Sequence, residues 1–243
     1  MGKRPFFSII VPAYNEEETI GATLESLKGQ SFKDFEIIVV NNNSTDKTGQ
    51  IAKKLVKTVL FEKRQGYIYT VQRGARKARG AYLTFADADS IYQKDWLQKF
   101  VKCINSSPDA GGIYGSARFY DNNPIINFLS GIIYSSFLRI SHIMGHFNPA
   151  GFNFVVKKKA YFDAGGYDPK IYNNISPDVE LGDRIAKKWK LILDTSNVVH
   201  TSSRRFNKNN LIKTTWMFFN AWVSLHFGKK QKIDYEQYNR ERR

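Results

Sequence analysis

An entirely apolar segment, Ile37 to Val40, most constrains the fold of this chain, because a strand without polar residues must be covered on both faces. It belongs to a predicted strand, Phe35 to Val40. Similar strands are predicted at 6–11, 58–61 and 81–86, and residues with helical spacing separate them. Four alternations of strand and helix are typical of an α/β fold with a mostly parallel central sheet flanked by helices.

Polar residues and turn formers follow each of these strands. Right-handed crossovers bring the carboxyl ends of parallel strands to one rim, where ligands bind. The sequence places Pro12, Asn42, Gly66 and the Asp87-Ala88-Asp89 triplet on that rim. Carboxylates are the ligands that hard divalent cations prefer. An Asp-x-Asp triplet is by itself also a common acidic turn.

The second half of the chain has a less regular pattern. Apolar residues at helical spacing between 125 and 144 predict an amphipathic helix with a polar opposite face. Loops at 147–154 and 171–175 are expected to be mobile and to border the second substrate. Further strands are predicted at 112–120, 152–156, 191–193 and 198–200, and further helices at 96–104 and 178–188.

Composition narrows the class of partner. A net charge of +15 indicates an anionic partner or surface. The basic residues are spread along the chain and no nucleic-acid-binding motif is present, which argues against a nucleic-acid-binding protein. The single cysteine, Cys103, excludes a disulfide framework and a cysteine-based metal site. Lys3 and Arg4 precede too short an apolar run for a signal peptide, so a cytoplasmic location is expected.

The segment from Leu211 to Phe227 is rich in aromatic residues and flanked by basic ones. It is shorter than the ~20 apolar residues that span a bilayer. An amphipathic helix lying on an anionic membrane surface, at the cytoplasmic face, fits this pattern, and a helix packed on the domain is the alternative.

Four stretches, in order, resemble the family 2 glycosyltransferases, which have the GT-A (Rossmann-like) fold. They are SIIVPAYNEEETI, FEIIVVNNNSTDKT, GARKARGAYLTFADAD, and GFNFVVKKKAYFDAGGYDP followed by PDVELGDRI. The resemblance implies an inverting enzyme that moves a sugar from a nucleotide-sugar donor to a hydroxyl acceptor, such as a glycan or a lipid-linked acceptor. It implies a GT-A domain over 1–205 (nucleotide-binding half 1–110, acceptor half 111–205). Residues 206–243 then form the C-terminal amphipathic helix and basic tail.

The resemblance also implies roles in catalysis and metal binding. Asp89 is expected to bind Mn²⁺ or Mg²⁺ directly, while Asp87 contacts ribose or the metal through water, with Ala88 between them in the donor site. A divalent cation neutralises the charge that develops on the departing diphosphate. His200 is a further candidate ligand, or merely a polar strand end. Asp178 is expected to be the base that deprotonates the acceptor, with Glu180 as the second candidate.

Donor recognition is expected at the first strand ends. Pro12, Tyr14 and Glu16 are predicted to line the nucleotide pocket, and Gly66, Arg64 and Arg73 to meet base or phosphate. Relatives often bind uracil through an acid at the end of the second strand. Asn41 and Asn42 replace both acids here, and because Asn both accepts and donates, UDP- and GDP-linked donors stay open.

A sugar-phosphate nucleotidyltransferase is the alternative enzyme. Such an enzyme would normally carry a glycine-rich, basic phosphate loop after the first strand. The turn from Pro12 to Glu16 is neither glycine-rich nor basic. The two activities differ in product, because the alternative forms pyrophosphate from a nucleoside triphosphate.

Overall fold

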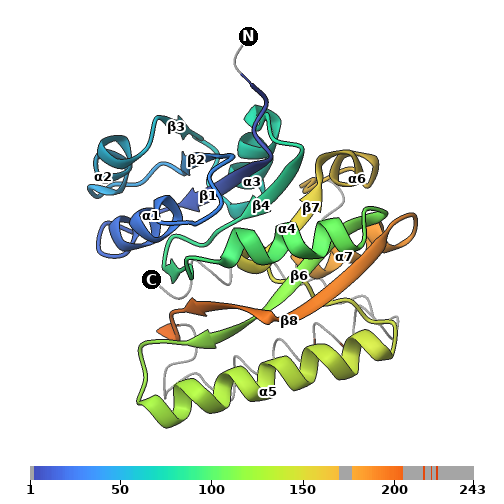
Figure 1. Cartoon of the computed structure of the whole chain (residues 1–243). Helices are drawn as coiled ribbons and strands as arrows, with labels where there is room; N and C mark the ends of the chain where they lie inside the picture. Colours follow the sequence, from blue (N-terminus) through green and yellow to red (C-terminus); the bar gives the residue numbers. More distant parts are fainter. Residues whose placement is uncertain (1–2, 170–176, 205–215, 217–219, 221–222, 224–243) are drawn as a thin grey trace.

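The computed structural model describes residues 3–169 and 177–204, together with 216, 220 and 223. An eight-stranded sheet runs through the described part of the chain in the order β3-β2-β1-β4-β7-β6-β8-β5. Helices cover it on both sides (Figure 1). The predicted α/β fold with a mostly parallel sheet is confirmed.

The first half alternates strands and helices as predicted. Its elements are β1 (Phe7–Ala13), α1 (Ile20–Lys28), β2 (Phe35–Asn41), α2 (Thr48–Leu55), β3 (Thr58–Phe61), α3 (Tyr67–Lys77) and β4 (Tyr82–Phe85). Within this half, the four strands pair with one another in parallel. Ala13, Asn41 and Phe61 are register partners at the carboxyl ends of β1, β2 and β3, so the loops that follow start at one edge.

The second half completes the sheet with a change of direction. Its elements are β5 (Ser90–Ile91), α4 (Trp96–Ser106), β6 (Ala110–Phe119), α5 (Pro124–Ile143), the 3-10 helix η1 (Gly151–Asn153), β7 (Phe154–Lys157), α6 (Lys158–Asp163), α7 (Pro177–Ala186) and β8 (Lys190–Thr201). Strand β7 is antiparallel to both β4 and β6, whereas β6 and β8 are parallel.

Two predictions for the second half were wrong. Segments 191–193 and 198–200 are parts of one strand, β8, and the β6–β8 register jumps from Gly115↔Asp194 to Ser116↔Val198. The polar residues of this bulge interrupt the apolar pattern, which suggested two strands. The expected mobile loop at 147–154 contains η1 and the start of β7, with Asn148 and Asn153 buried. The other expected loop, at 171–175, lies outside the described residues.

The core lies on both faces of the sheet, which explains the apolar strands. Adjacent residues of a strand point to opposite faces. Ile9 belongs to one core cluster with α1 and α4 residues such as Leu24 and Phe100, and Ile10 belongs to a second with α3 and α7 residues such as Val71 and Ile185. Each strand of the first half is therefore covered on two sides, as its composition requires.

Helix α5 is confirmed, and its polar side faces the sheet. Ser135 bonds Ser116 of β6 at 2.6 Å, the Arg139 guanidinium donates to Thr195 of β8 at 2.7 Å, and His142 bonds the Tyr114 hydroxyl at 2.8 Å. Most apolar residues of α5 consequently point away from the sheet, whereas Leu138 is buried in the core.

The predicted C-terminal helix and tail, 206–243, lie outside the described residues except at 216, 220 and 223, which are helical. Within the described part of the chain, no helix combines the length and apolarity needed to cross a bilayer.

Candidate functional site

The loops after β1 and β2 are joined by hydrogen bonds that fix their shape. The backbone N–H of Glu16 donates to Thr48 Oγ1 at 2.7 Å, and that of Glu17 donates to Asp46 at 3.0 Å. Asn15 and Asn43 take the left-handed conformation, with φ of 51° and 59°, which Asn tolerates better than most residues. The Glu16 side chain is thereby held at the edge of the sheet.

The acidic triplet forms the turn between β4 and β5. Asp89 is buried, whereas Asp87 is half-buried. The Ala88 carbonyl accepts a hydrogen bond from Thr23 Oγ1 at 2.8 Å, which anchors the turn to α1. Because β5 pairs with the end of β8, through Ser90↔Thr201, residues just after β8 come next to Asp89.

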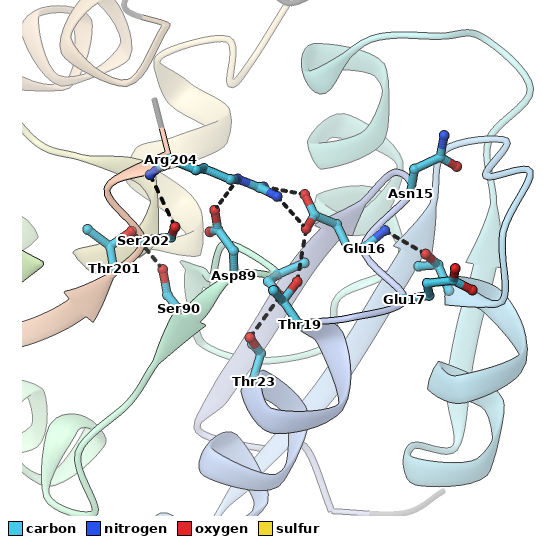
Figure 2. A network of polar contacts seen from close by, with 12 residues as sticks. Asn15, Glu16, Glu17, Thr19, Thr23, Asp89, Ser90, Thr201, Ser202 and Arg204 are labelled. Carbon is cyan, nitrogen blue, oxygen red and sulfur yellow. Dashed lines mark hydrogen bonds and ion pairs between the residues drawn. The ribbon is translucent and has the colours of Figure 1, made fainter. Parts of the chain in front are cut away.

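Arg204 lies between the carboxylates of Asp89 and Glu16, as Figure 2 shows. Its Nε is 2.9 Å from Asp89 Oδ2, its Nη1 donates to Glu16 Oε2 at 2.9 Å, and its Nη2 contacts Glu16 Oε1. Thr19 Oγ1 also donates to Glu16 at 2.9 Å. Sequence reasoning missed Arg204, since the only signal there was a pair of adjacent arginines.

The carboxylates fit a hard divalent cation. Glu16 and Asp89 offer oxygen ligands of the kind that Mg²⁺ and Mn²⁺ prefer, and the structure places a cationic group between them. Among the described residues, no three His, Cys, Asp or Glu side chains gather into a complete metal site. Substrate phosphates usually supply the remaining ligands in such sites.

His200 has other partners in the structure. Arg118 Nε donates to its Nε2 at 2.8 Å, and Gln93 lies 3.2 Å from its Nδ1. Burial, and then the charge of Arg118, lower the pKa of His200. The ring is thus held neutral beside the end of β8, and its role as a metal ligand stays a prediction.

Asn42 organises the loop between β3 and α3. Its amide nitrogen donates to the carbonyls of Glu62 at 3.1 Å and Arg64 at 2.7 Å, and its oxygen accepts from the Gly66 N–H at 2.8 Å. Gly66 has φ of 137°, which disfavours other residues. Both amide donors of Asn42 are therefore used, and only its oxygen retains capacity for a base.

Glu62 holds the two arginines that sequence reasoning assigned to the donor. This buried carboxylate bonds Arg64 Nε at 3.0 Å and lies 3.9 Å from Arg73 Nη1. Hydrogen bonding by Arg64 is the main cause that lowers the pKa of Glu62. Arg64 also lies over the Tyr69 ring, 4.5 Å from its centroid. Arg64 lies in the loop before α3 and Arg73 in α3 itself, and no sequence pattern indicated that Glu62 binds them.

Asp178 lies in the first turn of α7, where two tyrosine hydroxyls approach its Oδ1. Tyr67, next to Gly66 at the start of α3, lies 3.5 Å from it, and Tyr167 contacts it more closely. Burial and then the charge of Asp178 raise the pKa of Tyr167 well above its ordinary value. Tyr167 therefore keeps its proton and donates to the carboxylate.

The other acids of α7 have different surroundings. Glu180 forms a two-point ion pair with Arg184, at 2.7 and 2.8 Å, which engages the second candidate base. Burial and the charge of Glu180 raise the pKa of Asp183 to about 6.

The two other residues predicted to line the nucleotide pocket, Pro12 and Tyr14, are both half-buried, at the end of β1 and in the loop after it.

Known proteins with similar sequences are glycan synthases. The chain is 26% identical over 196 residues to a poly-β-1,6-N-acetyl-D-glucosamine synthase of Staphylococcus epidermidis, covering 76% of this chain and 45% of the relative. A Staphylococcus aureus relative of the same name matches equally well. The chain thus spans less than half the length of these curated relatives.

Solved structures share the fold. The mannosyltransferase PcManGT from Pyrobaculum calidifontis, in complex with GDP-Man and Mn²⁺, aligns with a TM-score of 0.76 and 19% identity over 95% of this chain and 66% of its own. Staphylococcus aureus TarS 1-349, in complex with UDP-GlcNAc, aligns with a TM-score of 0.63 and 21% identity over 81% and 58% of the two chains.

The family profile described as glycosyl transferase family 2 matches residues 8–163, which include β1, the acidic triplet and β7. This match covers more than half of the chain. The chain belongs to glycosyl transferase family 2.

Proposed function

We propose that this protein transfers a sugar from a nucleotide-sugar donor to a hydroxyl acceptor, with inversion at the anomeric carbon. The observation that carries the proposal is the position of two acidic sites, one at Asp89 and Glu16 and one at Asp178, near the edge where the parallel strands end. Asp89 lies after β4 beside Glu16, and Tyr67, at the start of α3, reaches Asp178. The named relatives, which include proteins in complex with GDP-Man and UDP-GlcNAc, support a nucleotide-sugar donor.

The reaction is a single displacement. The acceptor oxygen attacks the anomeric carbon, the bond from that carbon to the diphosphate oxygen breaks, and the acceptor proton moves to Asp178. Tyr67 and Tyr167 direct their hydroxyls at Oδ1 of Asp178, so they orient the carboxylate. Asp89, with Asp87 nearby, would hold Mn²⁺ or Mg²⁺, which supplies neutralising charge to the leaving diphosphate. The arginines held by Glu62 would meet the nucleotide.

Turnover of a panel of UDP- and GDP-sugars, with Mn²⁺ or Mg²⁺, tests this proposal. We expect cation-dependent release of a nucleoside diphosphate. An Asp178→Asn variant should lower the rate about 10²- to 10⁴-fold, the usual contribution of a positioned base. The matched control is Asp183→Asn on the same helix, which should keep the rate. Pyrophosphate formation from a nucleoside triphosphate and a sugar phosphate would instead support a nucleotidyltransferase.

We also propose that the enzyme works on an anionic membrane surface and that α5 takes part in binding it. Large apolar residues on the outward face of α5 are between 46% and 85% exposed, and no charged side chain is among them: Ile125, Ile126, Phe128, Leu129, Ile132, Ile133, Ile140 and Ile143. Exposed apolar patches of this extent mark interaction sites.

Two observations favour a bilayer as the partner of this face. The segment after β8 is bonded to the turn before α5, since Ser203 N donates to Asp121 at 2.8 Å and Asn122 donates to Ser203 at 2.6 Å. Residues 204–243 follow directly after Ser203. They contain ten of the 37 basic residues of the chain but only three of its 22 acidic residues. An apolar face beside a basic segment suits an anionic membrane surface.

Sedimentation with phosphatidylglycerol and phosphatidylcholine vesicles tests the membrane proposal. Wild-type protein should bind the anionic vesicles, and an Ile133→Gln, Ile140→Gln variant should bind them less. Phe162→Gln, which changes an exposed apolar residue of α6, is the control. A Trp216→Gln variant measures the contribution of the predicted helix at 211–227 to vesicle binding. Equal binding by the α5 variant and wild type, or concentration-dependent dimers that the α5 variant loses, would assign the face to another partner.

A further inference from the structure

The Arg204 guanidinium occupies the position that the proposed function assigns to a metal ion. Its three nitrogens contact Asp89 and both oxygens of Glu16. Charge-assisted contacts of this forked kind are among the stronger polar interactions in proteins. The two carboxylates therefore already have a cationic partner when no divalent cation is bound.

The side chain of Arg204 can leave this position without disturbing the sheet. The backbone before it is fixed, because Ser202 Oγ donates to Asp121 at 2.6 Å and Ser203 N to the same carboxylate at 2.8 Å. The Arg204 side chain is 46% exposed, whereas those of Glu16 and Asp89 are 13% and 8% exposed. The guanidinium is thus the most accessible member of the cluster, because Asp89 is buried and Glu16 is half-buried.

A guanidinium and a divalent cation repel each other strongly at the separation that one carboxylate imposes. A metal ion on Asp89 would stand beside Arg204 and would lose part of its attraction to the acids. Binding of the metal alone should consequently be weakened by Arg204. A diphosphate changes this balance, because it brings negative oxygens that bind Arg in two-point contacts.

We propose that Arg204 competes with the divalent cation for Asp89 and Glu16, and that it moves to the diphosphate once metal and nucleotide have bound. This inference rests on the proposed function, since it assigns Arg204 to the same donor site. It makes Arg204 an inhibitor of metal binding in the free enzyme and a ligand of the donor in the loaded enzyme. A residue with only a structural role would not have effects of opposite sign on the two ligands.

The test compares Arg204→Gln with wild type in two binding measurements. In the first, Mn²⁺ alone is titrated and followed by electron paramagnetic resonance, and the variant should bind about tenfold more tightly. In the second, inorganic pyrophosphate, UDP and GDP are titrated by calorimetry at saturating Mn²⁺, and the variant should bind them about tenfold more weakly. A charged hydrogen bond accounts for changes of this size.

Two further variants control for charge and folding. Lys28→Gln removes one positive charge at the far, exposed end of α1 and should leave both affinities unchanged. Arg204→Lys keeps the charge but loses the fork, so its Mn²⁺ affinity should fall between wild type and Arg204→Gln. It also serves as the test variant if Arg204→Gln does not fold.

The possible failures have separate meanings. If Arg204→Gln binds Mn²⁺ as weakly as wild type or more weakly, Arg204 does not compete with the metal ion. If its diphosphate affinity is unchanged, Arg204 does not move to the donor. Turnover of nucleotide sugars can persist in both cases. Failure of the wild-type protein to bind Mn²⁺ or any of the three diphosphates contradicts the proposed function itself. Adding Asp89→Asn to Arg204→Gln should remove the gained Mn²⁺ affinity, which locates the ion.

Discussion

At the scale of single residues, the site is built from acids whose neighbours differ. Asp89 and Glu16 share Arg204, Asp178 receives tyrosine hydroxyls, and Glu180 is paired with Arg184. The sequence shows each of these as an acid near a strand end or helix start. Which acid is paired with a cation depends on residues up to 188 positions away, as in the Glu16–Arg204 contact.

Asp183 predicts a pH dependence of stability. Its pKa is raised from 3.8 to about 6, so its ionised form is disfavoured in the folded protein. The protein should therefore be less stable above about pH 6 and gain stability as the pH falls toward 4. Asp183→Asn should stabilise the protein by about 1 kcal/mol at neutral pH, after allowance for solvent screening at this half-buried group.

Chemical denaturation at about pH 7.5 and about pH 4.5 measures this effect, with Asp109→Asn as the control in an exposed turn. The gain should be present at the higher pH and small at the lower pH. A gain of equal size at both values would mean that ionisation of Asp183 is not its cause.

The hydrogen bonds of Asn42 lead us to expect that an acid at this position destabilises the protein. Asn42→Asp would replace two amide donors with a carboxylate that faces the carbonyls of Glu62 and Arg64. We expect a loss of about 2 to 4 kcal/mol in unfolding free energy, because buried groups lose their hydrogen bonds. Asn41→Asp, in which the side-chain oxygen still accepts from Ser44, should cost less than half as much when both are measured by denaturation.

At the scale of elements, the first half of the fold could be predicted from the sequence and the second half only in part. Strands β1 to β4 are short and apolar, and the intervening helices have regular spacing, so local pattern and tertiary environment agree. Strand β8 contains the polar bulge after Asp194, and β5 has two residues, Ser90 and Ile91. Their pairing is decided by contacts that local sequence does not encode.

Asn153 shows how such contacts hold the second half together. Its amide nitrogen donates to the carbonyls of Ser116 in β6 at 2.7 Å and Asn197 in β8 at 2.8 Å, and its oxygen accepts from the Trp96 indole of α4 at 2.8 Å. Asn153 is fully buried. It bridges three elements through a single side chain.

Asn153→Ala should destabilise the protein by about 3 kcal/mol or more, because three buried partners lose their hydrogen bonds. Thermal unfolding measures the loss, and Asn105→Ala, at an exposed residue of α4, is the control. A change in Tm no larger than that of the control would show that water replaces the Asn153 bonds.

At the scale of the whole molecule, the sheet separates three functions. The edge where β1 to β4 end carries the residues that we propose to bind the donor, and α7 supplies Asp178, the proposed base. Helix α5 lies on the other side of β6 and β8 (Figure 1), and its exposed residues are largely apolar. Tyr134 of α5 packs against the core cluster that also contains Leu181 of α7, the helix of the proposed base, and burial and then the charge of Asp178 raise the pKa of Tyr134. A membrane-bound acceptor could thus reach the base from the side on which α5 lies.

The sequence pointed to this arrangement through the acidic triplet and Asp178, while the outward orientation of α5 and the position of Arg204 required the structure. A helix with one polar and one apolar side is usually placed with its apolar side inward. In helix α5 the polar side faces the sheet instead, because Ser135, Arg139 and His142 have polar partners on β6 and β8.

The location of bound manganese tests the central claim most directly. Crystals grown with Mn²⁺ and either UDP or GDP, measured at the manganese absorption edge, should give an anomalous peak in coordination contact with an Asp89 carboxylate oxygen and the diphosphate. Arg204 should have left Asp89 in the same crystals. A peak at any other place in the chain, or an Arg204–Asp89 ion pair that persists beside the bound nucleotide, would contradict this account.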